Sequence, residues 1–142
     1  MNFTKAQAEA FVRILLQTSV PLSNNEPGAD FGFSPVWEMF MRRSQPPISI
    51  EDYVVRLVFH LKLDESILQK ILAYKNRLAE LAGCVVDKDH AHRFLIASVT
   101  IACKLCREEV YSLSYISKVG GVGVKELQSL EFGLCQLLDW RI

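Results

Sequence analysis

The chain has 142 residues, the size of one ordinary domain, and half of them are hydrophobic, so it can bury a sizeable core. Its 16 basic and 16 acidic residues balance, which argues against recruitment of nucleic acid or anionic membranes by a general basic field. The cysteines lie in apolar or helical patterns and residues 1–7 lack the pattern of a secretion signal, so we expect reduced, buried thiols and a location in the nucleus or cytoplasm.

The first 47 residues predict a helix, a loop and a short helical turn. Thr4 is a candidate N-cap for the helix, and residues 21–35 are rich in Pro, Gly, Asn and Ser, which is typical of a loop. Residues 45–47 (QPP) are expected to be extended, because a residue before proline avoids the helical region. The apolar residues expected to pack inward are Ala6, Ala10, Phe11, Ile14 and Leu15 in the helix and Trp37, Phe40 and Met41 in the turn.

Two amphipathic helices are predicted next. Ser49 is the candidate N-cap of the first and Asp64 that of the second, which Gly83 is suited to end. Apolar residues at three- and four-residue spacing predict one buried face on each helix. These residues are Ile50, Tyr53, Val54, Leu57, Val58 and Leu61 in the first helix and Ile67, Leu68, Ile71, Leu72, Tyr74, Leu78 and Leu81 in the second.

The third helix of this series, residues 90–106 (HAHRFLIASVTIACKLC), is expected to lie at the centre of the domain. It is apolar on nearly every side, which is typical of a buried helix, but too short for the roughly 18 residues that span a bilayer. Either Asp87 or Asp89 is the expected N-cap.

Two more helices complete the prediction, over residues 112–119 and 123–138, with a Gly120-Gly121 turn after the shorter one. The inward residues expected in the last helix are Val124, Leu127, Leu130, Leu134 and Leu138. No stretch alternates between apolar and polar residues as a strand does, so the expected fold class is all-α.

Two charged residues disagree with this apolar pattern. Lys104 lies near the end of the central helix, and Glu131 lies in the middle of the apolar stripe of the last helix. A charge in such a place is costly unless it is paired, hydrogen-bonded or at an edge that another molecule covers. Two interpretations stay open: an internal ion pair or a lysine that reaches water, and a pair of polar anchor points within an apolar docking surface.

Several segments taken together resemble the cyclin box. They are SIEDY at 49–53, AYKNRL at 73–78, ACKL at 102–105, YSLSYISKVGGV at 111–122, LE at 130–131 and LDWR at 138–141. Over roughly residues 31–142 the chain is most similar to the phosphate-signalling (P/U-type) cyclins of yeasts and protists. The resemblance implies an N-terminal helix and loop extension over residues 1–47 and a single five-helix cyclin box, wrapped on its third helix, over residues 48–142.

The resemblance also implies a function without catalysis and without a cofactor. Cyclins are regulatory subunits that bind a cyclin-dependent protein kinase and hold its C helix in the active position, which keeps the kinase Lys–Glu ion pair formed. A lysine at the end of the third helix and a glutamate in the fifth contact the kinase in this family, and the matching residues here are Lys104 and Glu131. The matching apolar interface residues are Ile101, Leu105, Cys135 and Trp140. Nucleic acid and membrane are not expected partners.

Two features depart from the usual cyclin pattern. Asn76 stands before Arg77 where the family commonly has Asp, which removes one partner of the usual local ion pair. The helix that begins SIEDYVVRL lacks the hydrophobic substrate-docking motif of cell-cycle cyclins, so that docking mode is not expected. The match to the first cyclin box ends at Ile142, so we expect a single box without a second cyclin-box repeat. This is what a piece of a longer protein would show.

Other functions have weaker support in the sequence. Cys103 and Cys106 form a CxxC, but no second pair of ligands completes a tetrahedral zinc site, so we expect core thiols and no metal site. Nothing marks a nucleophile, and residues 120–123 (GGVG) lack the strand and spacing of a phosphate loop, which makes an enzyme a distant third hypothesis. The main alternative is a cyclin-fold adaptor for transcription or nucleic-acid complexes, against which the neutral charge argues.

Overall fold

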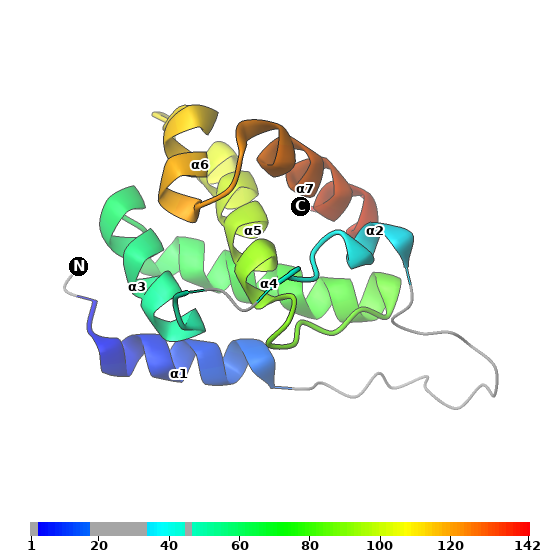
Figure 1. Ribbon diagram of the computed structural model, residues 1–142, viewed down its shortest axis with the longest axis horizontal. Helices are drawn as coiled ribbons and strands as arrows, with labels where there is room; N and C mark the ends of the chain where they lie inside the picture. Colours follow the sequence, from blue (N-terminus) through cyan, green and yellow to red (C-terminus); the bar gives the residue numbers. More distant parts are fainter. Residues whose placement is uncertain (1–2, 18–33, 45–46) are drawn as a thin grey trace.

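The computed structural model describes residues 3–17, 34–44 and 47–142, and all regular secondary structure in these segments is helical. The helices are α1 (Lys5–Leu16), α2 (Pro35–Glu38), α3 (Ile50–Leu61), α4 (Glu65–Ala82), α5 (Ala91–Cys106), α6 (Leu113–Gly120) and α7 (Val124–Leu137) (Figure 1). The predicted all-α fold class is therefore confirmed. Most of the predicted loop over 21–35 and most of the predicted extended segment over 45–47 lie outside the described residues.

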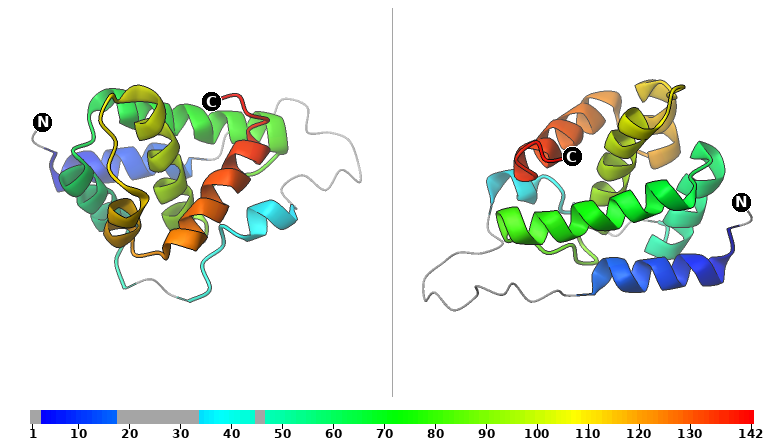
Figure 2. Two further views of the ribbon diagram at one scale, coloured as in Figure 1. Left: turned by 90° about the horizontal axis from the view of Figure 1, so that it is seen from above. Right: turned by 180° about the vertical axis from the view of Figure 1, so that it is seen from behind.

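Helix α5 is the centre of the bundle, as predicted. Helices α3, α4 and α7 pack against it (Figures 1 and 2), and residues 94–103 are all buried. The two buried hydroxyl groups in this run stay hydrogen-bonded, because Ser98 donates to the carbonyl of Leu95 at 3.1 Å and Thr100 to that of Ile96 at 2.7 Å. None of the described helices combines the length and the apolar character needed to cross a membrane.

Most helix ends follow the predicted capping residues. The hydroxyl of Thr4 accepts the backbone N–H of Gln7, and the Gln7 side chain accepts the N–H of Thr4, which forms a capping box. The predicted N-caps Ser49 and Asp64 each accept a backbone N–H from the third residue after them, and Ser112, for which no cap was predicted, does the same for α6. Gly83 ends α4 in the left-handed conformation that favours glycine, and Gly121 does the same after α6.

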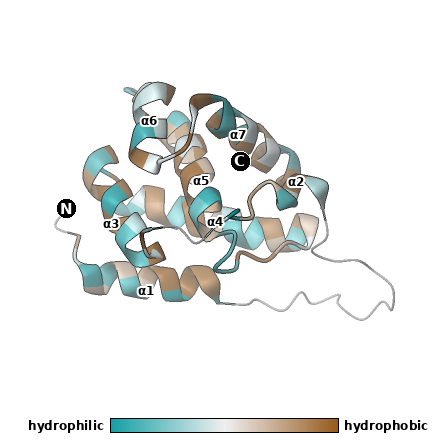
Figure 3. Ribbon diagram, viewed as in Figure 1, coloured by the Kyte–Doolittle hydropathy of each residue, from teal (hydrophilic) through white to brown (hydrophobic). Residues whose placement is uncertain are grey.

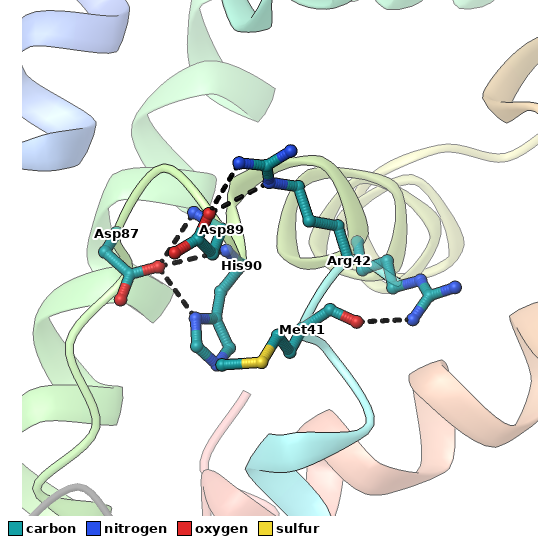
Figure 4. Close-up of polar contacts among 6 residues, drawn as sticks. Met41, Arg42, Asp87, Asp89 and His90 are labelled. Atoms are coloured by element: carbon teal, nitrogen blue, oxygen red, sulfur yellow. Dashed lines mark hydrogen bonds and ion pairs between the residues drawn. The ribbon is translucent and has the colours of Figure 1, made fainter. Parts of the chain in front are cut away.

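The start of α5 differs from the prediction that Asp87 or Asp89 is its N-cap. The N-cap is His90, and its side chain makes no capping bond. Oδ1 of Asp87 instead accepts the N–H groups of Asp89 at 2.9 Å and His90 at 3.1 Å and lies 2.7 Å from Nδ1 of His90 (Figure 4). The carboxylate of Asp89 pairs with Arg42, so both acids stabilise the turn before the helix rather than its first turn.

The predicted inward face of α1 is partly wrong. Ala6, Ala10 and Ile14 are exposed, and Figure 3 shows mixed hydropathy along this helix. Its buried residues are Ala8, Phe11, Val12 and Leu15. Because α1 packs against both α3 and α4, the covered face is displaced from the stripe that alanine spacing suggested.

Three other apolar residues predicted to pack inward are exposed: Met41, Leu81 and Val124. Each lies at or beyond the end of a helix, where fewer neighbours cover a side chain. The remaining inward faces of α3, α4 and α7 are largely as predicted, with Ile50 and Leu72 only half-buried.

Helix α1 is tied to the bundle by a buried lysine. Nζ of Lys75 donates to the carbonyl oxygens of Ile14 at 3.0 Å and Gln17 at 2.7 Å, which belong to the C-terminal end of α1. A cation is favourable there because the last carbonyls of a helix lack partners within the helix. Burial lowers the pKa of Lys75.

The predicted division of the chain into an N-terminal extension over residues 1–47 and a five-helix domain over residues 48–142 stays a prediction.

Candidate functional site

The two charges that disagreed with the apolar pattern lie together at the C-terminal end of α5, beside α7. Nζ of Lys104 donates to Oε1 of Glu131 at 2.6 Å and to Oε2 at 2.9 Å. The lysine side chain is 42% exposed and the glutamate side chain 19% exposed. The ion pair anticipated in one interpretation therefore exists, but it lies at the surface, where another molecule can reach it.

Local structure favours a lysine at this position. Lys104 lies in the last turn of α5, where a cation interacts favourably with the negative end of the helix dipole. The pair with Glu131 adds little to folding, because ion pairs that water reaches contribute about 0–1 kcal/mol. Fold stability alone gives only a weak reason for these two charges.

Exposed apolar side chains follow both members of the ion pair along the chain. Leu105 follows Lys104 and is 51% exposed, Phe132 follows Glu131 and is 55% exposed, and Trp140 is 57% exposed. The rings of Phe132 and Trp140 meet edge to face, with centroids 5.6 Å apart. Large exposed apolar groups around a polar centre are typical of a protein-docking surface. We call Lys104, Leu105, Glu131, Phe132 and Trp140 the α5–α7 surface.

Two residues that the cyclin resemblance placed at the interface lie beneath this surface. Ile101 is 3% exposed and Cys135 is 6% exposed. Burial raises the pKa of the Cys135 thiol, the charge of Glu131 raises it further, and Lys104 opposes the change. These two side chains support the α5–α7 surface from below and present little area to a partner.

Trp140 is held in place by an unusual backbone. Asp139 and Trp140 have φ angles of 52° and 59°, in the left-handed region that residues other than glycine seldom occupy. The N–H of Trp140 donates to the carbonyl of Cys135 at 2.9 Å, and Arg77 donates to the carbonyl of Arg141 at 2.8 Å. A strained conformation costs about 1–3 kcal/mol and persists where the surrounding structure determines it. Here it holds an indole on the surface.

Phe132 was missed by the sequence reasoning. It follows Glu131 and lies outside the stripe of Leu127, Leu130, Leu134 and Leu138, so helical spacing assigns it to the exposed face. An aromatic residue on an exposed face next to an out-of-place charge is the signal that identifies it.

The cysteines form no disulfide, and three of them are buried as predicted: Cys84, Cys103 and Cys135. The prediction is wrong for Cys106, which is exposed because α5 emerges from the core at its last turn. Burial raises the pKa of Cys84 to about 11 and also raises that of Cys103, which disfavours the reactive thiolate. Within the described segments, no group of three or more His, Cys, Asp or Glu side chains is arranged to hold a metal ion.

Comparison with known proteins adds a family match that covers nearly the whole chain. The family model described as Cyclin matches residues 6–142. The chain is 36% identical over 104 residues to the Nuc-1 negative regulatory protein preg of Neurospora crassa, with 72% of this chain and 22% of that protein covered. It is 30% identical over 115 residues to PHO85 cyclin-7 of Saccharomyces cerevisiae, with 72% and 40% covered.

A plant protein is similar to this chain at a comparable identity and coverage. The chain is 32% identical over 112 residues to Cyclin-U1-1 of Arabidopsis thaliana, with 78% of this chain and 53% of that protein covered. The chain therefore spans between about a fifth and about half of the length of these relatives.

Proposed function

Because this chain belongs to the cyclin family, we propose that it is a non-catalytic regulatory subunit that binds and activates a cyclin-dependent protein kinase. In this proposal the chain docks on the C helix of the kinase and holds it in the position that keeps the kinase Lys–Glu ion pair formed. Two of its relatives are named PHO85 cyclin-7 and PHO85 cyclin-like protein psl1, which supports a kinase partner of the PHO85 type. The nucleus and the cytoplasm are the proposed locations.

The observation that carries the proposal is the α5–α7 surface. Its charges are paired with each other, so the free protein tolerates them, and its exposed leucine and aromatic rings offer apolar area to a partner. Covering the surface removes water from the ion pair, which strengthens any hydrogen bond that the partner adds to it. Aromatic anchors beside a desolvated charge contact are typical of the residues that dominate binding energy.

Each residue has a role in this proposal. Lys104 and Glu131 make polar contacts to the kinase, and Leu105, Phe132 and Trp140 fill apolar depressions on it. Ile101 and Cys135, both buried, keep α5 and α7 at the separation that the surface needs. No metal and no cofactor takes part.

The proposal is tested by mixing the purified chain with purified cyclin-dependent kinases and measuring phosphorylation of a peptide substrate. We expect saturable stimulation of at least one kinase and a complex detectable by calorimetry. A chain that is helical by circular dichroism but neither binds nor stimulates any kinase of its own organism contradicts the proposal.

A further inference from the structure

A second surface feature lies at the other end of α5. A pocket of about 420 Å³ opens where the segment after α2 meets α3, the first turn of α5 and the turn between α6 and α7. Its charged lining residues are Arg42, Arg43, Arg56, Arg93 and Glu126. Four arginines and one glutamate line the pocket, and Asp89 pairs with Arg42 there, so four guanidinium groups meet two carboxylates in a chain that has no net charge. We call this feature the basic pocket.

Two of the guanidinium groups are fixed in place by the fold. Arg93 donates to the carbonyl of Met41 at 2.6 Å and pairs with Glu126 at 2.9 Å. Nε and Nη2 of Arg42 each lie 2.9 Å from the carboxylate of Asp89 (Figure 4). These contacts hold the walls of the basic pocket before any ligand arrives, so less order is lost on binding.

The other two guanidinium groups keep unused hydrogen-bond donors. Nε of Arg56 donates to the carbonyl of Val119 at 2.7 Å, which orients the group, and its terminal nitrogens have no hydrogen-bond partner in the part of the chain that the structure describes. Arg43 is exposed and makes no hydrogen bond or ion pair with any described residue. A guanidinium group has five N–H donors in a fixed planar fork, so Arg56 retains four of them for a ligand.

The helix ends near the pocket add to its positive potential. Among the described helices, α5 and α7 alone begin without a side-chain capping bond, and their first turns supply His92, Arg93 and Glu126 to the lining. Uncapped N-terminal N–H groups and the positive end of the helix dipole both favour an anion. His92 is not counted among the cations, because burial lowers its pKa, and the hydrogen bond that its Nε2 donates to the carbonyl of Ile48 at 2.9 Å opposes this only in part.

We propose that the basic pocket binds the phosphate group of a phosphorylated serine or threonine within an extended peptide. Phosphate monoesters carry about two negative charges and accept paired N–H bonds from arginine, which is how arginine clusters recognise phosphorylated side chains. The volume exceeds that of a phosphate group, and the apolar lining of Pro47, Ile48 and Val122 gives flanking peptide residues a surface to contact. If the chain activates a kinase as proposed above, the bound kinase would act preferentially on substrates already phosphorylated once.

The test uses the purified chain alone, so its outcome is independent of kinase binding. The probe is a short fluorescein-labelled peptide with one phosphothreonine, compared with the same peptide carrying unmodified threonine and with the same peptide carrying glutamate. Binding is followed by fluorescence anisotropy at low and at physiological salt. We expect the phosphorylated peptide to bind at least about tenfold more tightly than either relative, with an affinity that falls as salt rises.

Three substitutions locate the site. Arg56→Gln is expected to weaken binding about tenfold or more, and Arg43→Gln about threefold. Because Arg43 has no described partner, its substitution leaves folding intact and keeps the test valid if Arg56→Gln unfolds the chain. Arg13→Gln removes an exposed arginine of α1 outside the basic pocket and should leave the affinity unchanged.

Three results would overturn the proposal. The first is equal binding of the phosphorylated and unmodified peptides, and the second is a loss with Arg13→Gln as large as with Arg56→Gln. The third is complete displacement of the phosphopeptide by an equal concentration of inorganic phosphate, which would mark a general anion site that makes no use of the peptide.

Discussion

At its C-terminal end α5 places one cation against one anion among exposed apolar side chains, whereas at its N-terminal end four guanidinium groups meet only two carboxylates. The charges at the first end balance, and the feature left open to a partner is the exposed apolar area of Leu105, Phe132 and Trp140. The second end has an excess of positive charge, and the feature left open to a partner is the set of unused N–H donors on Arg43 and Arg56. The same buried helix therefore presents two surfaces of different chemistry, one suited to a folded protein and one suited to an anion.

The core between the two surfaces keeps them apart. Residues 94–103 are buried, and α3, α4 and α7 hold them on three sides. A change in the core should therefore harm both surfaces together, whereas a change at either end should harm that end alone. The following predictions test this separation.

The largest effect is expected from Phe94→Ala. Phe94 is fully buried, and its ring lies edge to face with Trp37 at 6.4 Å between centroids. The cavity left by such a truncation costs about 3–5 kcal/mol of unfolding free energy, a large part of the total for a domain of this size. Urea denaturation followed by circular dichroism measures the loss. Kinase binding and phosphopeptide binding should fall together in proportion to the folded fraction, and loss of one without the other would contradict a shared core.

A smaller and local effect is expected from Trp140→Ala. Removing an aromatic anchor from the centre of an interface costs about 2 kcal/mol or more of binding, so kinase affinity should fall roughly thirtyfold. The melting temperature should change little, because the side chain is 57% exposed. Phe59→Ala is the matched control, since Phe59 is a 75% exposed aromatic residue on α3 and is not part of the α5–α7 surface. An equal loss of affinity in both variants would remove the specific role of Trp140.

The smallest effect is expected from acidification, and it acts at the other end of α5. Burial lowers the pKa of His92, and Arg42 lowers it further, while the hydrogen bond to Ile48 and the charge of Glu51 oppose this. The unfolded chain therefore binds a proton more readily than the folded chain as pH falls below about 6.5, so acid reduces the stability contributed by neutral His92.

This pH dependence can be isolated by substitution. Urea unfolding at about pH 7 and about pH 5.5 should show a larger loss of stability in the native sequence than in His92→Gln, which keeps a donor for the Ile48 carbonyl but does not titrate. The same loss in both proteins would show that other groups cause it.

Periodic apolar spacing and short-range capping made most of the fold predictable. The buried faces of α3 and α4, the N-caps Ser49 and Asp64 and the glycine that ends α4 follow from local sequence. The inward face of α1 did not, because it depends on two neighbouring helices that local spacing does not specify. The cap of α5 was also missed, since Asp89 bonds to Arg42, which is distant in sequence.

The candidate site was predictable for its charges and less so for its shape. Lys104 and Glu131 stood out because each interrupts an apolar stripe, and the cyclin resemblance indicated the same two positions. Their pairing, the burial of Ile101 and Cys135 and the exposure of Phe132 arise from how α5 packs on α7, which pattern alone leaves open. The basic pocket is lined by residues from several elements, so no single stretch of sequence predicts it.

The most direct test of the central claim is to exchange the two charges by combining Lys104→Glu with Glu131→Lys and to measure kinase affinity and thermal stability. The exchanged residues can pair again, so the melting temperature should fall only slightly, because an acid at a helix C-terminus costs only about 0.3–1 kcal/mol of unfolding free energy. The exchanged protein should bind the kinase about 2–5 kcal/mol more weakly than the native protein does, because the charges presented to the partner are reversed. Native affinity in the exchanged protein would contradict the account, since it would show that Lys104 and Glu131 serve the fold and take no part in docking.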